Sequence, residues 1–387
     1  MIRKKRDHVF YCILVSALLC VFVWTRNSER FEANKPTSKD GHMSRKSADT
    51  PDICSLKTDF FFLNVPRCAS ETLMALLLRF TMFRSLNPIF RPHYPYHFHT
   101  EQLLTVKLLP PPKNQTYNVF VNHVNFHQNR RALETLLPSE SRYIGIVRNP
   151  FLRFIHTLVH GKWFENQRGF FNRNLEEKVN ITDIEILMRY SSKHSEIGTG
   201  NLTNFLLYYF GYHKPDYIDA EVDEFTRTTF QKFDLILLAD HFEESLILLR
   251  RTMCWSTRDI LYLGEVHKHN YTDKIMSISN SKNISEWFKE NNAADIKFYE
   301  ACVKRFWDRV SIEGSDFWAE VEAFKEILQH VKSFCGGNST SKNLRINKSQ
   351  WTKRFFISKH FCDLMRLGSS QIMDTVSYYA MERSHVL

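Results

Sequence analysis

The sequence has no C-x-x-C pair, so the usual spacing of a zinc site is missing. It also lacks G-x-x-x-x-G-K-S/T, which excludes a nucleoside-triphosphate P-loop, and it has no internal repeat. Two of its eight cysteines lie in an apolar N-terminal run, and the other six allow fifteen disulfide connectivities. No particular pairing follows for these six, which are Cys54, Cys68, Cys254, Cys302, Cys335 and Cys362.

The composition excludes a disordered or low-complexity chain, because 43% of the residues are hydrophobic and 14% are aromatic. The 387 residues can bury one large core or two modest ones. The formal net charge of +10 at pH 7 suits nucleic acid, an anionic membrane surface or a small polyanionic ligand. The N-terminal sequence helps to decide among these three kinds of partner.

The N-terminus predicts a membrane anchor. A basic cluster, Arg3–Arg6, precedes the uncharged run Val9–Trp24. As a helix this run would extend about 24 Å, and flanking aromatic and basic residues can adapt it to a hydrocarbon core of about 30 Å. A cleaved signal peptide is the alternative, but the run is long and bulky and no A-x-A-like site follows Trp24. We therefore expect an uncleaved anchor.

This anchor sets the expected topology. Basic residues before a span stay in the cytosol, so residues 1–8 form the predicted cytoplasmic tail, 9–24 the transmembrane signal anchor and 25–57 a polar lumenal stem. A short span favours the early secretory pathway and argues against a nucleic-acid partner. An oxidising lumen permits disulfides. Seven glycosylation sequons fit this assignment, at Asn114, Asn180, Asn201, Asn270, Asn283, Asn338 and Asn347.

Short apolar runs alternate with helical patterns from residue 58 onward. Continuous apolar runs predict strands buried on both faces, and their alternation with helices predicts βαβ units. The fold class is therefore α/β, with a central parallel sheet flanked by helices. The expected strands are Asp59–Val65, Asn118–Asn122, Tyr143–Val147 and Phe233–Ala239, and the expected helices are Glu71–Phe83, Asn129–Leu137, Phe151–Phe164 and Phe242–Met253.

The pattern beyond Ile284 is helical, and its aromatic residues are expected in the core rather than on a base-stacking surface. Gly336–Thr340 is a break in this pattern. We therefore predict a main domain over residues 58–335 and a C-terminal extension over residues 336–387. Its basic and polar beginning favours a loosely attached tail.

The turn Asn64–Thr72 joins a predicted buried strand to an amphipathic helix. Free N–H groups and the helix dipole at such a turn bind anions. Arg67 adds a fixed positive charge, and Ser70 and Thr72 add hydroxyl donors. The simpler alternative is a Ser70 N-cap followed by Glu71 and Thr72 in the first helical turn.

Two further strands end in residues suited to anion chemistry. Arg148 follows a buried strand and precedes Pro150, which fits the first position of a helix. A guanidinium at this edge of the sheet suits a phosphate, although a surface ion pair with a carboxylate is the alternative. His123 ends another strand, where it could accept the proton of an attacking hydroxyl if the anion-binding turns lie close by.

Together these stretches resemble the membrane-bound Golgi carbohydrate sulfotransferases, most closely the galactose-3-O-sulfotransferase family that includes galactosylceramide sulfotransferase. The resemblance covers roughly residues 58–335, which it identifies as a sulfotransferase catalytic domain. The most family-specific segment is Phe233–Arg251, whereas a strand followed by Arg-Asn-Pro occurs in many sulfotransferases. The His-Val-x-Phe element starting at His123 is also similar to that of uronyl 2-O-sulfotransferases.

The resemblance implies a P-loop-like sulfotransferase fold in a single-pass type II Golgi membrane protein. It implies sulfuryl transfer from PAPS (3′-phosphoadenosine 5′-phosphosulfate) to the 3-hydroxyl of galactose on a glycolipid or glycan. No metal is required. The implied roles are His123 as the base, Arg67 as a stabiliser of the leaving phosphate, the turn Arg67, Cys68, Ala69, Ser70 and Thr72 as the 5′-phosphosulfate loop, and Arg148 with His156 as ligands of the 3′-phosphate.

Four positions depart from the family pattern. Arg67 replaces a Lys, Glu71 replaces a Ser or Thr, His156 replaces a Ser and Tyr209 replaces an Asp. A carboxylate beside a phosphate is unfavourable unless it points away, so Glu71 is the departure with the clearest physical cost. Two alternatives follow: a uronyl 2-O-type or other glycosaminoglycan sulfotransferase, or a weak or silent relative that binds glycan or nucleotide. The sequence does not indicate an oligomeric state.

Overall fold

The computed structural model describes residues 54–92, 103–159, 203–212, 218–264, 278–337 and 341–384, all within the unit Cys54–Leu387. The predicted cytoplasmic tail, the anchor 9–24 and nearly all of the stem lie outside the described residues. Within these ranges, no helix is long and apolar enough to cross a membrane.

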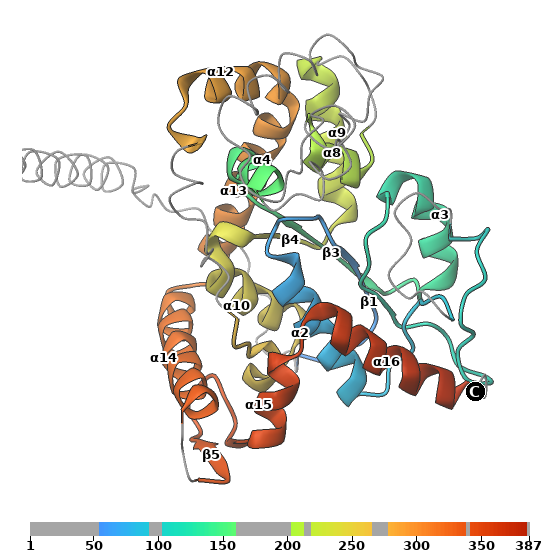
Figure 1. The fold of residues 1–387 in the computed structure, drawn as a ribbon, viewed down its shortest axis with the longest axis vertical. Helices are drawn as coiled ribbons and strands as arrows, with labels where there is room; N and C mark the ends of the chain where they lie inside the picture. The colour runs from blue at the N-terminus through green and yellow to red at the C-terminus, as the bar shows by residue number, and fades with distance from the viewer. Residues whose placement is uncertain are drawn as a thin grey trace, which may run out of the picture. The chain divides into compact units, whose positions relative to one another are not determined.

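Four short parallel strands form the central sheet in the order β2-β1-β3-β4. Figure 1 labels β1, β3 and β4 of this sheet. Every residue of β1, β2 and β4 is buried, because helices pack on both faces of the sheet. Each predicted apolar run coincides with one strand, although β3 begins one residue before its run, so the predicted parallel sheet is confirmed. The strands are β1 (Phe60–Leu63), β2 (Val119–Phe120), β3 (Arg142–Val147) and β4 (Leu235–Leu238).

A helix follows each strand, as the alternating pattern predicted. Asn125 starts α3 three residues before its predicted beginning, because its side chain accepts a hydrogen bond from the Gln128 N–H at 3.1 Å. Asn149 caps α4 in the same way through the Leu152 N–H, also at 3.1 Å. The four helices are α2 (Ser70–Phe83), α3 (Phe126–Leu136), α4 (Pro150–Val159) and α10 (Phe242–Met253).

Helices from before and after β4 in the sequence pack around the long helix α13. This helix contacts β4 and the helices α4, α8, α9 and α12, and Phe298 and Phe306 on it are buried. The expectation that this aromatic set belongs to the core is confirmed for these residues. The remaining helices and 3-10 turns of the main domain are α8 (Phe205–Phe210), α9 (Asp219–Lys232), η2 (Ala239–His241), η3 (Thr257–Ile260), α12 (Lys282–Asn291), α13 (Ala293–Ile312) and α14 (Asp316–Gly336).

The segment that leads into β1 is fastened to the end of α10. A disulfide joins Cys54 to Cys254. Three residues later the Lys57 N–H donates to the Met253 carbonyl at 2.9 Å, and the Trp255 indole N–H donates to the Lys57 carbonyl at 2.8 Å. The chain is therefore fixed in place before the sheet begins.

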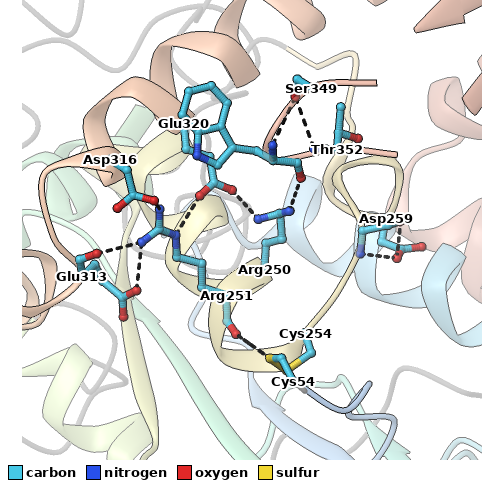
Figure 2. A network of polar contacts seen from close by, with 12 residues as sticks. Cys54, Arg250, Arg251, Cys254, Asp259, Glu313, Asp316, Glu320, Ser349 and Thr352 are labelled. Atoms are coloured by element: carbon cyan, nitrogen blue, oxygen red, sulfur yellow. Dashed lines mark hydrogen bonds and ion pairs between the residues drawn. A yellow bond between two sulfur atoms is a disulfide. The ribbon is translucent and has the colours of Figure 1, made fainter. Parts of the chain in front are cut away.

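A buried ionic network joins α10 to α14 (Figure 2). Glu320 is only 3% exposed and accepts hydrogen bonds from both Arg250 and Arg251, the latter at 2.7 Å. Arg251 also contacts Glu313 and Asp316 from the same helix region. Both arginines end the family-specific segment Phe233–Arg251, so the structure gives this part of that segment a role in joining helices.

The C-terminal extension is part of the domain, so the prediction of a loosely attached tail was wrong. Its final helix packs along α2 (Figure 1) and buries Ile372, Met373, Val376 and Ala380. A disulfide between Cys335 and Cys362 joins the extension to the end of α14. The extension comprises the antiparallel pair β5 (Asn343–Ile346) and β6 (Phe355–Ser358), then α15 (Lys359–Arg366) and α16 (Ser369–Arg383).

Candidate active site

The polar residues that follow the strands gather at the carboxyl edge of the sheet. β1 leads to Arg67, β2 to His123, β3 to Arg148 and β4 to Asp240. Because β1 lies between β2 and β3, the turn after β1 is adjacent to the other two predicted sites. This edge is where ligands of open parallel sheets bind.

The turn between β1 and α2 has an unusual backbone. Arg67 and Ala69 both adopt positive φ angles, 68° and 55°, which non-glycine residues rarely do. Ala69 is the N-cap of α2 and provides no side-chain hydrogen bond, so the predicted alternative of a Ser70 N-cap was wrong. The first N–H groups of a 14-residue helix therefore have no side-chain cap from Ala69, which leaves them suited to an anion. Local strain of this kind is common at ligand-binding turns.

His123 lies beside this turn. Its Nδ1 is 2.7 Å from the carbonyl oxygen of Asn64, the first residue after β1. A carbonyl only accepts, so Nδ1 carries the proton and the lone pair of the neutral ring is on Nε2. The ring also meets Tyr209 edge-on, with centroids 6.4 Å apart. The geometry therefore sets the imidazole in the orientation that a base acting through Nε2 requires.

Arg148 also contacts the same turn. Its Nη1 donates to the Arg67 carbonyl at 3.5 Å, and its Nε lies 3.8 Å from Asp240 Oδ1. The residue is 8% exposed, so its ion pair lies within the sheet edge and is unlike the surface pair considered as an alternative. His123 and Arg148 thus reach the β1–α2 turn from opposite neighbouring strands.

Asp240 is a site residue that the sequence analysis missed. Its Oδ2 accepts hydrogen bonds from the Asn149 N–H at 2.8 Å and from the Tyr299 hydroxyl at 2.9 Å. Burial and the neighbouring carboxylate raise the pKa of Tyr299, which keeps its hydroxyl a donor. Asp240 therefore links the turn after β3 to the end of β4 and to α13. Its position directly after a predicted strand is the sequence signal that could have identified it as a site residue.

Arg153 is a second residue that was missed. It is 1% exposed, and its Nε and Nη2 have no hydrogen-bond partner among the residues that the structure describes. Its guanidinium carbon lies 4.0 Å from the centre of the Phe205 ring, and burial lowers its pKa while Asp295 opposes this effect. Burial also raises the pKa of Asp295 to about 6, with Arg153 and the N–H groups at the start of α8 acting in the opposite direction.

Cys68 lies between the two strained residues of the turn and is fully buried. Burial raises the pKa of its thiol to about 12, although Arg153 and Arg148 act to lower it. Both arginines are therefore close enough to this turn to influence its charge. The thiol stays neutral at physiological pH and so contributes no nucleophile.

Comparison with known proteins identifies the family of the chain. The family model described as galactose-3-O-sulfotransferase matches residues 3–354. The chain belongs to the galactose-3-O-sulfotransferase family. It is 25% identical over 295 residues to mouse galactosylceramide sulfotransferase, and this alignment covers 73% of this chain and 65% of the mouse protein. It is 23% identical over 300 residues to mouse galactose-3-O-sulfotransferase 2, covering 74% and 72%.

A bovine relative, galactose-3-O-sulfotransferase 3, is 24% identical over 294 residues, with 72% of this chain and 64% of the relative covered. The aligned part thus spans less than two thirds of the length of some relatives, including mouse galactosylceramide sulfotransferase. The residues that form the candidate site all lie inside the match to the galactose-3-O-sulfotransferase family.

Two departures from the family pattern have different structural settings. His156 is 4% exposed on α4, and its role as a phosphate ligand stays a prediction. Its neighbour Thr157 donates to the Arg153 carbonyl at 3.0 Å. Glu71 is turned toward the C-terminal extension, where Ser369 donates a hydrogen bond to it.

In the described part of this galactose-3-O-sulfotransferase family member, no group of three His, Cys, Asp or Glu side chains is placed to hold a metal ion.

Proposed function

We propose that this chain transfers a sulfuryl group from PAPS to the 3-hydroxyl of a galactose on a glycolipid or glycan. The observation that carries the proposal is the meeting of three predicted sites. His123 contacts Asn64 at the start of the β1–α2 turn, and Arg148 contacts Arg67 within it. One doubly charged nucleotide can therefore lie within reach of all three.

The donor-binding groups fit a phosphosulfate. The uncapped start of α2, together with Ser70 and Thr72, offers hydrogen-bond donors for the 5′ end, and Arg67 adds an exposed positive charge. Arg148 is the ligand proposed for the 3′-phosphate. Arg153 lies beneath the turn and raises its positive potential without reaching solvent.

His123 is the proposed base. Its Nε2 takes the proton of the sugar hydroxyl as the sugar oxygen forms a bond to sulfur and the bond from sulfur to the phosphate oxygen breaks. Adenosine 3′,5′-bisphosphate leaves, and Arg67 balances the negative charge that develops on its 5′-phosphate. The chemistry depends on positioning and charge, which the rigid turn and the fixed imidazole supply.

The cellular setting is part of the proposal. We place the chain in the Golgi membrane as a type II protein, anchored by residues 9–24, with a P-loop-like sulfotransferase domain in the lumen. The apolar run after a basic cluster supports the anchor. The disulfides Cys54–Cys254 and Cys335–Cys362 are consistent with an oxidising compartment.

The proposal is tested by incubating the full-length protein with radiolabelled PAPS and a panel of glycans, then mapping the labelled position. Label on the 3-hydroxyl of galactose is the expected result. Label on a uronic acid would favour the 2-O-type alternative. Binding of adenosine 3′,5′-bisphosphate with no label on any glycan would favour a silent relative.

Replacing Arg148 with alanine tests the donor site directly. We expect the affinity for adenosine 3′,5′-bisphosphate to fall by about 1.5–3 kcal/mol, the usual value of a hydrogen bond to a charged group. Calorimetric titration measures this change. Arg142 is the matched control, because it lies at the opposite end of β3 and pairs with Asp234 at 2.6 Å. Equal affinity in the Arg148→Ala and native proteins would remove Arg148 from the pocket.

A further inference from the structure

The carboxylate of Glu71 is held by the C-terminal helix. Glu71 lies in the first turn of α2, and the Ser369 hydroxyl donates a hydrogen bond to its Oε2. Ser369 is the first residue of α16 and is 6% exposed, so packing fixes the place of its hydroxyl. The positive end of this 15-residue helix attracts the same carboxylate.

The position of Ser369 is set by contacts on both sides of it. Before it, the Cys335–Cys362 disulfide joins α15 to the end of α14. After it, α16 packs along α2, and Arg383 donates to the Leu86 carbonyl at 2.7 Å just beyond the end of α2. Figure 1 shows α16 lying beside α2. The backbone at Ser369 therefore cannot move away from Glu71 without displacing a packed helix.

The carboxylate at this position conflicts with the proposed donor. The start of α2 is also where the phosphosulfate would bind, and like charges at one helix terminus repel. We propose that Ser369 is a positioning residue for donor binding, which keeps the negative charge of Glu71 directed at α16 and away from the anion site. This inference rests on the proposed function.

One partner of this contact lies outside the family match. The family match ends at residue 354, whereas Ser369 lies in a helix that begins 15 residues later. The family assignment therefore does not account for this partner of the donor turn. The C-terminal extension acquires a function in the site as well as in packing.

A double-mutant cycle on the full-length protein tests the proposal. The affinity for adenosine 3′,5′-bisphosphate is measured for the native protein, Ser369→Ala, Glu71→Ser and the double variant. We expect Ser369→Ala alone to weaken binding about three- to tenfold, because the released carboxylate repels the ligand. In the Glu71→Ser background the same change should alter affinity by less than about twofold. Ser377→Ala is the matched control, since Ser377 is buried in the same helix.

The outcomes separate the two proposals. If the native protein binds the nucleotide and Ser369→Ala binds equally well, the positioning role is wrong. An equal loss with and without Glu71 would also overturn it, because Ser369 would then act through the general fold. Thermal melting of all variants checks that α16 stays packed. If the native protein does not bind the nucleotide, the proposed function fails, and this inference with it.

Discussion

Replacing His123 with alanine is expected to lower sulfuryl transfer by about 10²–10⁴-fold, the usual contribution of a positioned base. The imidazole is held through Nδ1 by the Asn64 carbonyl at 2.7 Å, which commits Nε2 to proton transfer. Alanine removes the acceptor for the sugar proton and leaves the β1–α2 turn and Arg148 in place. Donor-product affinity should therefore stay nearly unchanged. Single-turnover assays with labelled PAPS and calorimetric titration measure the two quantities separately.

His127 provides a matched control for this experiment. It lies four residues further along, on the exposed side of α3, and is not part of the proposed site. Its replacement by alanine should leave turnover within about threefold of native, because surface substitutions rarely change stability by more than about 0.5 kcal/mol. Turnover at the native rate in His123→Ala would exclude the imidazole from the mechanism.

Replacing Glu320 with alanine is expected to lower the free energy of unfolding by about 3–5 kcal/mol. The side chain is 3% exposed and neutralises Arg250 and Arg251 together (Figure 2). Burial lowers the pKa of Arg250, and Glu320 opposes that effect, so removing the carboxylate leaves a positive charge in a dry environment. Urea denaturation followed by tryptophan fluorescence measures the change.

Glu322 is the control for this second experiment. It lies on the same helix, its side chain is 67% exposed, and it pairs with Lys325 at 2.9 Å. Glu322→Ala should change stability by less than about 1 kcal/mol, as expected for an exposed ion pair. A loss of similar size in both variants would show that helix propensity in α14, rather than the buried network, accounts for the effect.

The strands and the site edge could be predicted because they depend on local signals. Apolar runs such as Phe233–Ala239 contain a strand whose residues are all buried, and strand ends mark where ligands bind, so Arg148 and His123 could be assigned to one edge. The start of α2 could not be predicted correctly. Serine is favoured at an N-cap. In the structure Ala69 is the N-cap and has a positive φ, so the conformation of the whole turn, and not local residue preference, sets where α2 begins.

Other site residues depend on contacts between distant parts of the chain. Tyr299 and Asp295 come from α13, far along the chain from their partners, Asp240 and the start of α8, and no local pattern marks either one. The prediction of a loose C-terminal extension rested on its polar beginning. The apolar residues of α16 pack against α2, which lies far away in the sequence, so no local pattern could show this contact. The structure has two disulfides and leaves Cys68 and Cys302 as buried thiols, so it adopts none of the fifteen complete pairings of six cysteines.

The fastening of residues 54–57 has a mechanical consequence. A pull on the chain ahead of Cys54 is transmitted across a covalent crosslink to the end of α10, and the backbone bond from Lys57 to Met253 supports it. The force then acts on α10, which is bound by Glu320. It does not act on β1, the strand whose end leads into the anion-binding turn. Thermal motion of a tether would thus leave the geometry around Arg67 undisturbed.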